Sequence, residues 1–394
     1  MQHFDMVIVG GGMVGLALAS ALADTDIRIA IINSRALKAE LSKEPELRVS
    51  AINQANRIQF EAMGVWDAIE SNRLCNYRAM HVWDQDSFGE IDFHAKDLQL
   101  QFLGAIVENQ ALVNALAKQV KHQSNVTVFE NIAITQLSLG ESQHAIVLDG
   151  GGLMTASLIV GADGANSFVR QTAKFPVTLG DYGQTAIVAT VRSERPHEGV
   201  ARQVFTPFGP LALLPLADPL LCSIVWSQDT AETLRVMALA DSEFNKKLSV
   251  VSNHSLGRLQ KISKFQSFPL SRQYARQWVD TGIVLCGDAA HRFHPLAGQG
   301  ANLGFEDAWC LAKTLKSIAA RQTNNSDFRS PWEFREYERS RKAAAVKMIG
   351  AMEGFHQAFT GSNKAKKGLR GLALAAANAI SPIKKELARH ALGI

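Results

Sequence analysis

The sequence predicts an α/β protein: a Rossmann-type nucleotide-binding domain with an inserted antiparallel sheet and a C-terminal helical segment. Apolar residues 6–9 run into a glycine-rich turn, an Ala/Leu-rich helix and a second buried strand at 27–32. Between about 182 and 270, strand-like runs alternate with Gly/Pro turns, and from Gly300 onward the pattern is mostly helical. Strand–helix–strand order implies a parallel pair, whereas closely spaced strands between turns imply an antiparallel sheet.

The composition is that of a globular protein of two or three domains. The chain has 394 residues, of which 47% are hydrophobic and 20% charged. No run reaches about 18 uninterrupted apolar residues, so a membrane-spanning helix is not expected. The first residues, MQHFDMVIVGGG, lack the basic n-region of a secretory leader. The four cysteines show no CxxC spacing, so we expect reduced thiols in a cytoplasmic protein and no metal site.

The net charge of +4 resides in the C-terminal tail. Residues 362–394 hold seven Lys or Arg and one acid, Glu386, which leaves the rest of the chain slightly acidic. Such a body argues against nucleic acid as a partner. In the tail, Leu369, Leu372, Ala376 and Ile380 recur at helical spacing. A basic amphipathic helix can lie on an anionic membrane surface, or it can dock on the protein's own body or a partner subunit.

The glycine-rich turn has the spacing of a dinucleotide-binding motif. Gly10 permits the tight turn, Gly12 lets the backbone approach a pyrophosphate, and Gly15 packs the helix against the strand. The helix N-terminus then favours an anion. A purely structural glycine turn is the alternative. An acidic residue is expected about 20 positions on to hold the ribose, and Asn33 stands there, able to bond hydroxyls without charge.

Two later turns also follow buried strands. GADGANSFVR places Asp163 and Gly164 after the apolar run SLIV, in what is otherwise an ordinary turn. VLCGDAAHRFHPLAGQGANLG places Asp288 at a strand end, where it either caps the next segment or binds a polyol. Gly298 and Gly300 then lead into a helix whose free N–H groups would face a developing negative charge.

The spacing of these turns suits one long cofactor. A pyrophosphate would lie at residues 10–15, a ribitol at Asp288 and a flavin ring at 295–302. His291 and His294 stand three residues apart without a cysteine or carboxylate set, so we expect them to pack or hydrogen-bond rather than bind metal.

Taken together, GxGxxG, GADG and GDAAH…P.AGQG.N.G..D resemble the motifs of the class A flavoprotein monooxygenases, which share the p-hydroxybenzoate hydroxylase fold. The resemblance spans residues 4 to about 345. LRVSAIN, GVWDAI, IVENQALVNAL and FTPFGPLALLPL are similar to segments of the ubiquinone-biosynthesis ring hydroxylases. The resemblance implies three discontinuous parts of an FAD-binding domain (1–75, 100–178 and 270–345), a substrate domain (76–99 and 179–269) and C-terminal helices (346–394).

The activity that the resemblance implies is hydroxylation of a polyprenylated quinol or phenol in ubiquinone biosynthesis. FAD would be reduced by a transient donor, NAD(P)H, and O2 would then react through a flavin C4a-hydroperoxide in a dry site. The 3-methyl-6-methoxy-benzoquinol step is favoured. Another ring position of the same pathway and a catalytically silent FAD-binding subunit are the alternatives. A homo-oligomer, a biosynthetic complex and the inner-membrane surface are candidate partners.

The resemblance also assigns roles to residues by position. Arg48 and Asn109 would line the adenosine–pyrophosphate channel, and Asp163 would support FAD. Near the ring, His294 and Pro295 are the catalytic candidates, with simple packing as the alternative for His294. The expected cofactor-binding residues are Gly10, Gly12, Gly15, Asn33, Arg48, Asn109, Asp163, Gly164, Asp288, Pro295, Gly298, Gly300, Ala301 and Asn302.

The inserted sheet is expected to cover the substrate. Its apolar residues would line a channel for the prenyl tail, or they would form ordinary sheet core. These residues are Phe205, Phe208, Leu211, Leu213, Leu214, Val225 and Trp226.

Overall fold

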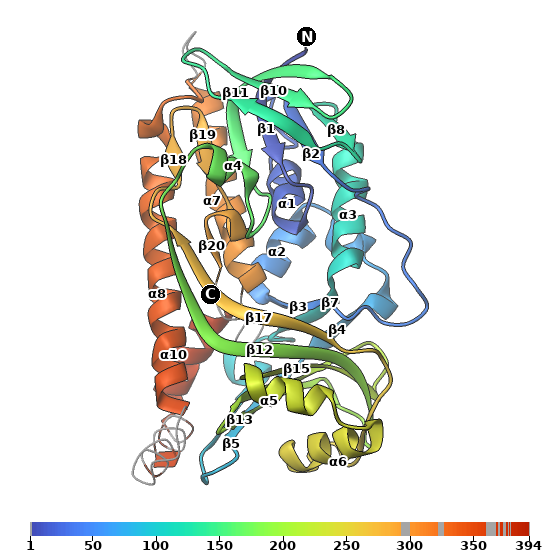
Figure 1. Ribbon diagram of the computed structural model, residues 1–394. Coiled ribbons are helices and arrows are strands. Elements are labelled where there is room, and N and C mark those ends of the chain that lie inside the picture. The colour runs from blue at the N-terminus through green and yellow to red at the C-terminus, as the bar shows by residue number, and fades with distance from the viewer. Residues whose placement is uncertain are drawn as a thin grey trace.

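The computed structural model describes residues 2–292, 300–321, 327–359 and 380–393, together with 368, 371, 372, 376 and 378. Two large sheets form the body, one above the other in Figure 1, with the long helix α8 (Arg335–Phe359) running beside both.

The first sheet is a mostly parallel sheet in the order β18-β19-β11-β1-β2-β8. Strands β19, β11, β1, β2 and β8 pair in parallel, and β9 and β10 extend the sheet from β11 in antiparallel fashion. Met6 to Val9 are all buried, as expected for a strand covered on both faces. The strands are β1 (Gln2–Val9), β2 (Ile29–Asn33), β8 (Val126–Glu130), β9 (Ile134–Ser138), β10 (His144–Leu148), β11 (Leu153–Gly161), β18 (Val279–Asp280) and β19 (Ile283–Leu285).

Helices pack against this sheet to form the larger core. Helix α1 (Met13–Ala21) lies against both α3 (Asn109–Lys121) and α7 (Gly300–Ala320). The core cluster joins Ile8 and Val160 of the sheet with Leu16 of α1. The remaining helices of this part are α2 (Gln54–Ala62) and α4 (Phe168–Thr172), with short 3₁₀ turns at Trp66–Ala68, Ser71–Arg73, Ala95–Leu98, Gly287–Ala289 (η4) and Pro331–Phe334.

The second sheet has the order β20-β17-β12-β15-β14-β13-β5-β6, with β16 beside β12. Its pairs are antiparallel apart from β13 and β5, which run parallel because more than a hundred residues of chain separate them and allow a crossover. Its strands are β5 (Ala79–Asp84), β6 (Glu90–His94), β12 (Val177–Ser193), β13 (Val200–Thr206), β14 (Gly209–Pro215), β15 (Leu221–Asp229), β16 (Leu259–Lys261), β17 (Gln266–Ala275) and β20 (His291–Arg292).

The expected inserted sheet is therefore present, and two of its strands reach the first sheet. In Figure 1, the long strands β12 and β17 curve from the lower sheet up towards β18 and β19. At its far end, β17 pairs with β20, so residues 291–292 of the third glycine motif join the second sheet.

The two faces of the second sheet have different neighbours. Leu211, Leu213 and Trp226 share a core cluster with Phe244 of α6 (Asp241–Val251), next to α5 (Thr230–Met237). These three residues therefore form sheet core on the side of α6, in agreement with the ordinary-core interpretation. Leu214 and Val225 point to the opposite face, towards the small sheet β3 (Val49–Asn53), β7 (Gly104–Glu108) and β4 (Leu74–Tyr77).

The C-terminal helix α10 (Ser381–Leu392) lies against the body of the protein. Ala388 and Leu392 are buried, and Leu392 packs with Tyr77 and Leu214 between the sheets. Leu372 and Ile380, by contrast, are exposed. Within the described part of the chain, no helix has the length and apolar character needed to span a bilayer.

Candidate active site

The three glycine motifs meet because their strands are neighbours. Val9 of β1 pairs with Gly161 of β11, and Gly161 pairs with Leu285 of β19. Parallel neighbours end at the same edge of the sheet, which is where doubly wound folds bind ligands. The turns that follow, at Gly10, Asp163 and Asp288, are therefore brought side by side.

The three glycines of the first motif differ in whether the fold leaves room for a side chain. Gly10 has φ +110°, and a Cβ there would lie 2.3 Å from the Ala162 carbonyl oxygen. A Cβ on Gly15 would lie 2.0 Å from the Gly10 oxygen. Gly12, the N-cap of α1, has φ −79°, and a Cβ there would meet no atom within 4 Å. Packing requires Gly10 and Gly15, whereas the space at Gly12 lies open at a helix N-terminus that favours anions.

Val14 joins the first motif to the third. Its side chain lies against Gly287 at the tip of β19 and against Gly304 of α7, where added Cβ atoms would come within 3.2 Å and 2.9 Å of it. Helix α1, the β19 tip and α7 are thus in direct contact, so their relative placement is fixed by close packing.

Asn33 bonds to the first motif from the end of β2. Its Oδ1 accepts a hydrogen bond from the Gly11 N–H at 3.0 Å, and its Nδ2 donates to the Arg35 carbonyl at 2.8 Å. The side chain therefore holds the glycine turn in this structure. An adenosine contact by Asn33 stays a prediction.

The second motif is held to the third by Arg170. Its guanidinium donates to the Ala289 and Ala165 carbonyls, both at 2.8 Å. Asp163 accepts from the Val169 N–H through Oδ2, while its buried Oδ1 has no partner in the part of the chain that the structure describes. Burial raises the pKa of Asp163, and hydrogen bonds from Ser167 and Val169 oppose the rise. A buried, unpartnered carboxylate oxygen suits a group that bonds a ligand.

Arg48 and Asn109 lie on facing segments. The Asn109 N–H donates to the Arg48 carbonyl at 3.0 Å, and Asn109 Oδ1 accepts from the Ser50 hydroxyl at 2.7 Å. The Arg48 guanidinium lies 5.9 Å from the ring centre of Phe268 on β17. Arg48 thus lies where the small sheet meets the second large sheet, close enough to Asp288 for its charge to oppose the rise in the pKa of that carboxyl.

Asp288 is exposed to solvent and yet surrounded by protein. The surrounding protein raises the pKa of its carboxyl, and the positive charges of His291, Arg292 and Arg48 oppose that rise. A carboxylate that faces solvent from within a crowded site is placed to bond the hydroxyls of a ligand rather than to pair with one cation.

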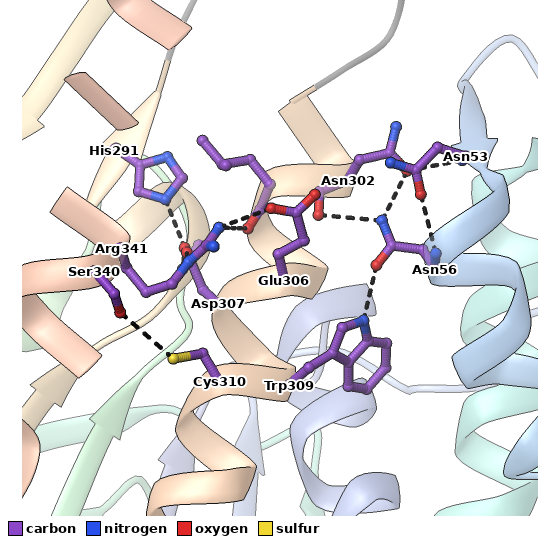
Figure 2. A network of polar contacts seen from close by, with 12 residues as sticks. Asn53, Asn56, His291, Asn302, Glu306, Asp307, Trp309, Cys310, Ser340 and Arg341 are labelled. Carbon is purple, nitrogen blue, oxygen red and sulfur yellow. Dashed lines mark hydrogen bonds and ion pairs between the residues drawn. The ribbon is translucent and has the colours of Figure 1, made fainter. Parts of the chain in front are cut away.

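Asn302, whose backbone is expected to face the ring, uses its side chain to fasten the start of α7. Its amide faces away from the helix N-terminus: Nδ2 donates to the Ala51 carbonyl at 2.7 Å, and Oδ1 accepts from the Asn53 N–H and from Asn56 Nδ2. Asn56 in turn accepts from Trp309 Nε1 at 2.8 Å, as Figure 2 shows. The side chain of Asn302 therefore ties α7 to β3 and α2, and only its backbone remains for a ring.

Of the other expected residues around the ring, Gly300 and Ala301 form the first turn of α7, and a Cβ on Gly300 would meet no atom within 4 Å. His294, Pro295 and Gly298 lie outside the described residues.

An ion-pair cluster beside Asp288 was not foreseen from the sequence. Asp307 of α7 accepts from His291 Nε2 at 2.5 Å and from Arg341 Nε at 2.6 Å (Figure 2). The one available signal is an aspartate within the apolar stripe formed by Leu303, Ala308 and Leu311, where a charge must have buried partners.

Comparison with known proteins decides the family. A family model described as "FAD binding domain" matches residues 3–351. The chain belongs to this FAD-binding domain family. Within it, the chain is 33% identical to the "3-demethoxyubiquinol 3-hydroxylase" of Escherichia coli K12, covering 100% of this chain and 99% of that protein.

Two further relatives agree with this placement. The chain is 33% identical to the "Ubiquinone biosynthesis monooxygenase COQ6, mitochondrial" of Rattus norvegicus, covering 98% of this chain and 90% of the relative. It is 32% identical to the "Ubiquinone hydroxylase UbiL" of Rhodospirillum rubrum, covering 99% and 89%.

Solved structures confirm the expected fold. The p-nitrophenol 4-monooxygenase PnpA of Pseudomonas putida DLL-E4 superposes with a TM-score of 0.79 at 17% identity, covering 100% of this chain and 99% of that one. PqsL of Pseudomonas aeruginosa gives 0.78 at 19% identity, covering 95% and 100%.

As a member of the FAD-binding domain family, the protein is an FAD-dependent aromatic hydroxylase, for which NAD(P)H is the typical donor. The site fits FAD on three observations: the open space at Gly12, the unpartnered Asp163 oxygen and the accessible carboxylate of Asp288. For each individual residue, a contact with FAD stays a prediction.

Proposed function

We propose that this protein hydroxylates the aromatic ring of a polyprenylated quinol or phenol in ubiquinone biosynthesis. The observation that carries the proposal is similarity along almost the whole chain to hydroxylases named for that pathway. The arrangement of the three motifs at adjacent strand tips supports it.

The proposed roles of individual residues are as follows. The N-terminus of α1 at Gly10–Gly15 would hold the pyrophosphate, with Asn33, Arg48 and Asn109 towards the adenosine. Asp288 would bind the ribitol hydroxyls, and Asp163 with Gly164 would support the cofactor beside it. Backbone N–H groups at the start of α7 would face the ring. When bound, FAD supplies the reduction of O2 and the transfer of one oxygen atom to the substrate.

The protein's own part is to place the substrate and exclude water. The parts of the chain at 1–75, 100–178 and 270–345 would hold FAD, and those at 76–99 and 179–269 would cover the substrate. Leu214 and Val225, on the face of the second sheet that is turned away from α5 and α6, are candidates for the wall along the prenyl tail. A dry site favours hydroxylation over loss of hydrogen peroxide.

We favour the 3-methyl-6-methoxy-benzoquinol as substrate because the E. coli relative is named for a 3-hydroxylase of demethoxyubiquinol. Hydroxylation at another ring position is the alternative, because COQ6 and UbiL are nearly as similar.

The test of function is a turnover assay with the purified holoenzyme. We expect a short-chain 3-methyl-6-methoxy-benzoquinol to stimulate NAD(P)H oxidation and O2 uptake and to gain one oxygen by mass spectrometry. NAD(P)H oxidation that yields only hydrogen peroxide, with the quinol unchanged, would contradict this substrate. An unresponsive yellow protein would favour the catalytically silent subunit.

We further propose that the protein is cytoplasmic and peripheral on the inner membrane. Phe88, Phe208 and Leu372 are 66%, 49% and 60% exposed. Phe88 lies beside Gly371, and the Gln85 N–H donates to Phe205 of β13 at 2.9 Å, so these side chains gather at one end of the second sheet. Gly371 of the basic tail, residues 362–394, lies against Phe88 at this end, and the positive charge of the tail would attract anionic lipid.

Liposome co-sedimentation tests this membrane proposal. We expect deletion of residues 364–394 to release the protein from anionic vesicles with FAD still bound. Because Leu392 is buried in the fold, the double substitution Phe88→Ser and Phe208→Ser serves as a second variant that leaves α10 in place. Full co-sedimentation of both variants would refute the proposal. Gel filtration of the same samples tests the expected homo-oligomer or complex.

A further inference from the structure

One carboxylate holds both ends of the turn that carries Asp288. Asp307 is 0% exposed, and its Oδ2 accepts from the Gly287 N–H at 3.2 Å and from His291 Nε2 at 2.5 Å. Gly287 directly precedes Asp288, and His291 follows it by three residues. The turn between them is therefore fixed at two points to the same side chain of α7.

The same carboxylate is anchored on its other side by α8. Arg341 donates to Asp307 Oδ1 at 2.6 Å, and its Nη2 donates to the Leu303 carbonyl at 3.2 Å and to Glu306 at 3.1 Å. These acceptors all belong to α7, so one guanidinium braces two turns of that helix (Figure 2). A planar guanidinium with several donors is well suited to such a brace.

The cluster keeps Asp307 ionised although it is buried. Burial alone would raise the pKa of Asp307, but the charges of His291 and Arg341 and their hydrogen bonds outweigh burial and lower it. His291 also stacks on Trp278, with ring centres 5.1 Å apart, so its orientation is fixed from a second direction. Removing one partner of such a buried pair leaves a charge without compensation and costs much more than a surface pair would.

Helix α7 thereby connects two segments that are expected to contact the same ligand. Its N-terminus at Gly300–Asn302 is fixed to β3 through the Asn302 amide, and its second turn fixes the Asp288 turn through Asp307. The segments expected to contact the ribitol and the ring of the flavin are thus both held in place by the same helix.

We propose that Asp307 is a positioning residue for the flavin: it sets the place of Asp288 relative to the N-terminus of α7 without touching the cofactor itself. Arg341 and His291 act through it. The inference rests on FAD occupying the site as proposed above, so the experiment measures the wild-type protein's FAD affinity first.

The test is Asp307→Asn, which keeps the shape of the side chain and removes its charge. We expect the Kd for FAD to rise about tenfold or more, the flavin's visible circular dichroism and midpoint potential to shift, and the gain in Tm on adding FAD to shrink. Tyr337→Phe is the matched control, because it removes another buried hydrogen bond between α8 and β19, from Tyr337 to the Leu285 carbonyl at 2.8 Å. That control should lower the Tm of apo and FAD-bound protein equally.

Two substitutions of His291 provide a second test if the Asp307→Asn protein does not fold. His291→Gln retains an N–H donor towards Asp307, whereas His291→Ala has none. We expect the alanine variant to weaken FAD binding and shift the flavin spectrum, and the glutamine variant to restore most of both. Variants that lose Tm equally with and without FAD, at unchanged Kd and spectrum, would show a merely structural cluster and overturn the proposal. A wild-type protein that binds no FAD would instead overturn the proposed site.

Discussion

Gly12→Asp is expected to abolish FAD binding while leaving the apo-protein as stable as the wild type. Gly12 has the extended conformation of an N-cap, and a side chain there meets no atom of the protein within 4 Å. Aspartate is among the best N-cap residues, so it should stabilise α1 rather than harm it. Its carboxylate would occupy the expected pyrophosphate position with the wrong charge, and we expect the Kd for FAD to rise by at least ~100-fold, about 2.7 kcal/mol.

Gly15→Ala is the matched comparison for this substitution. A Cβ on Gly15 would lie 2.0 Å from the backbone oxygen of Gly10, which cannot move without opening the turn. We therefore expect it to lose FAD and also to destabilise the apo-protein by about 1–3 kcal/mol, the usual cost of overpacking. FAD titration followed by fluorescence, together with thermal unfolding of both apo variants, separates the two cases. A Gly12→Asp protein that binds FAD normally would place the pyrophosphate elsewhere.

Asp288→Asn is expected to change stability and binding in opposite directions. The folded protein raises the pKa of Asp288, chiefly because the surrounding protein desolvates its carboxyl although the side chain still reaches solvent, so folding favours the protonated form. At neutral pH the ionised carboxylate then costs stability, and a neutral amide removes that cost, so the Tm of the apo-protein should rise. FAD affinity should fall, because hydrogen bonds to a charged acceptor are worth about 1.5–3 kcal/mol, or about 10- to 100-fold.

The pH dependence of the Tm difference between the Asp288→Asn and wild-type apo-proteins is the control for this prediction. As the pH falls through the raised pKa, the wild-type carboxyl takes up a proton and its penalty disappears. The Tm advantage of the apo Asp288→Asn protein should therefore be largest near pH 7.5 and shrink towards pH 4. An advantage that is constant with pH would mean that ionisation of Asp288 is not its cause. Unchanged FAD affinity would remove Asp288 from the cofactor site.

Much of the fold was predictable because its signals are local. The first strand, glycine turn and helix appear in unbroken order within 21 residues, and each glycine motif follows an apolar strand. Adjacent parallel strands then place the three turns together without further information. Alternation in PLALLPL likewise separates Leu211 and Leu213 from Leu214, although only the structure shows which face meets α6.

The parts that escaped prediction depend on contacts between distant residues. Asp307 meets His291 and Arg341 through the packing of α7 against β19 and α8, which no local pattern reveals. The Asn302 amide turns to Ala51 because α7 crosses the end of β3, some 250 residues earlier in the chain. In the same way, the tail pattern allowed two interpretations, and the burial of Ala388 and Leu392 shows that α10 docks on the body.

The most direct test of the whole account is amide hydrogen exchange of the wild-type protein with and without FAD. If three separate turns surround one flavin, adding FAD should slow exchange together at residues 10–16, 163–170 and 287–292, with the same dependence on FAD concentration at all three. Protection confined to residues 10–16, with the other two segments exchanging as in the apo-protein, would contradict the convergence on which every proposed role depends.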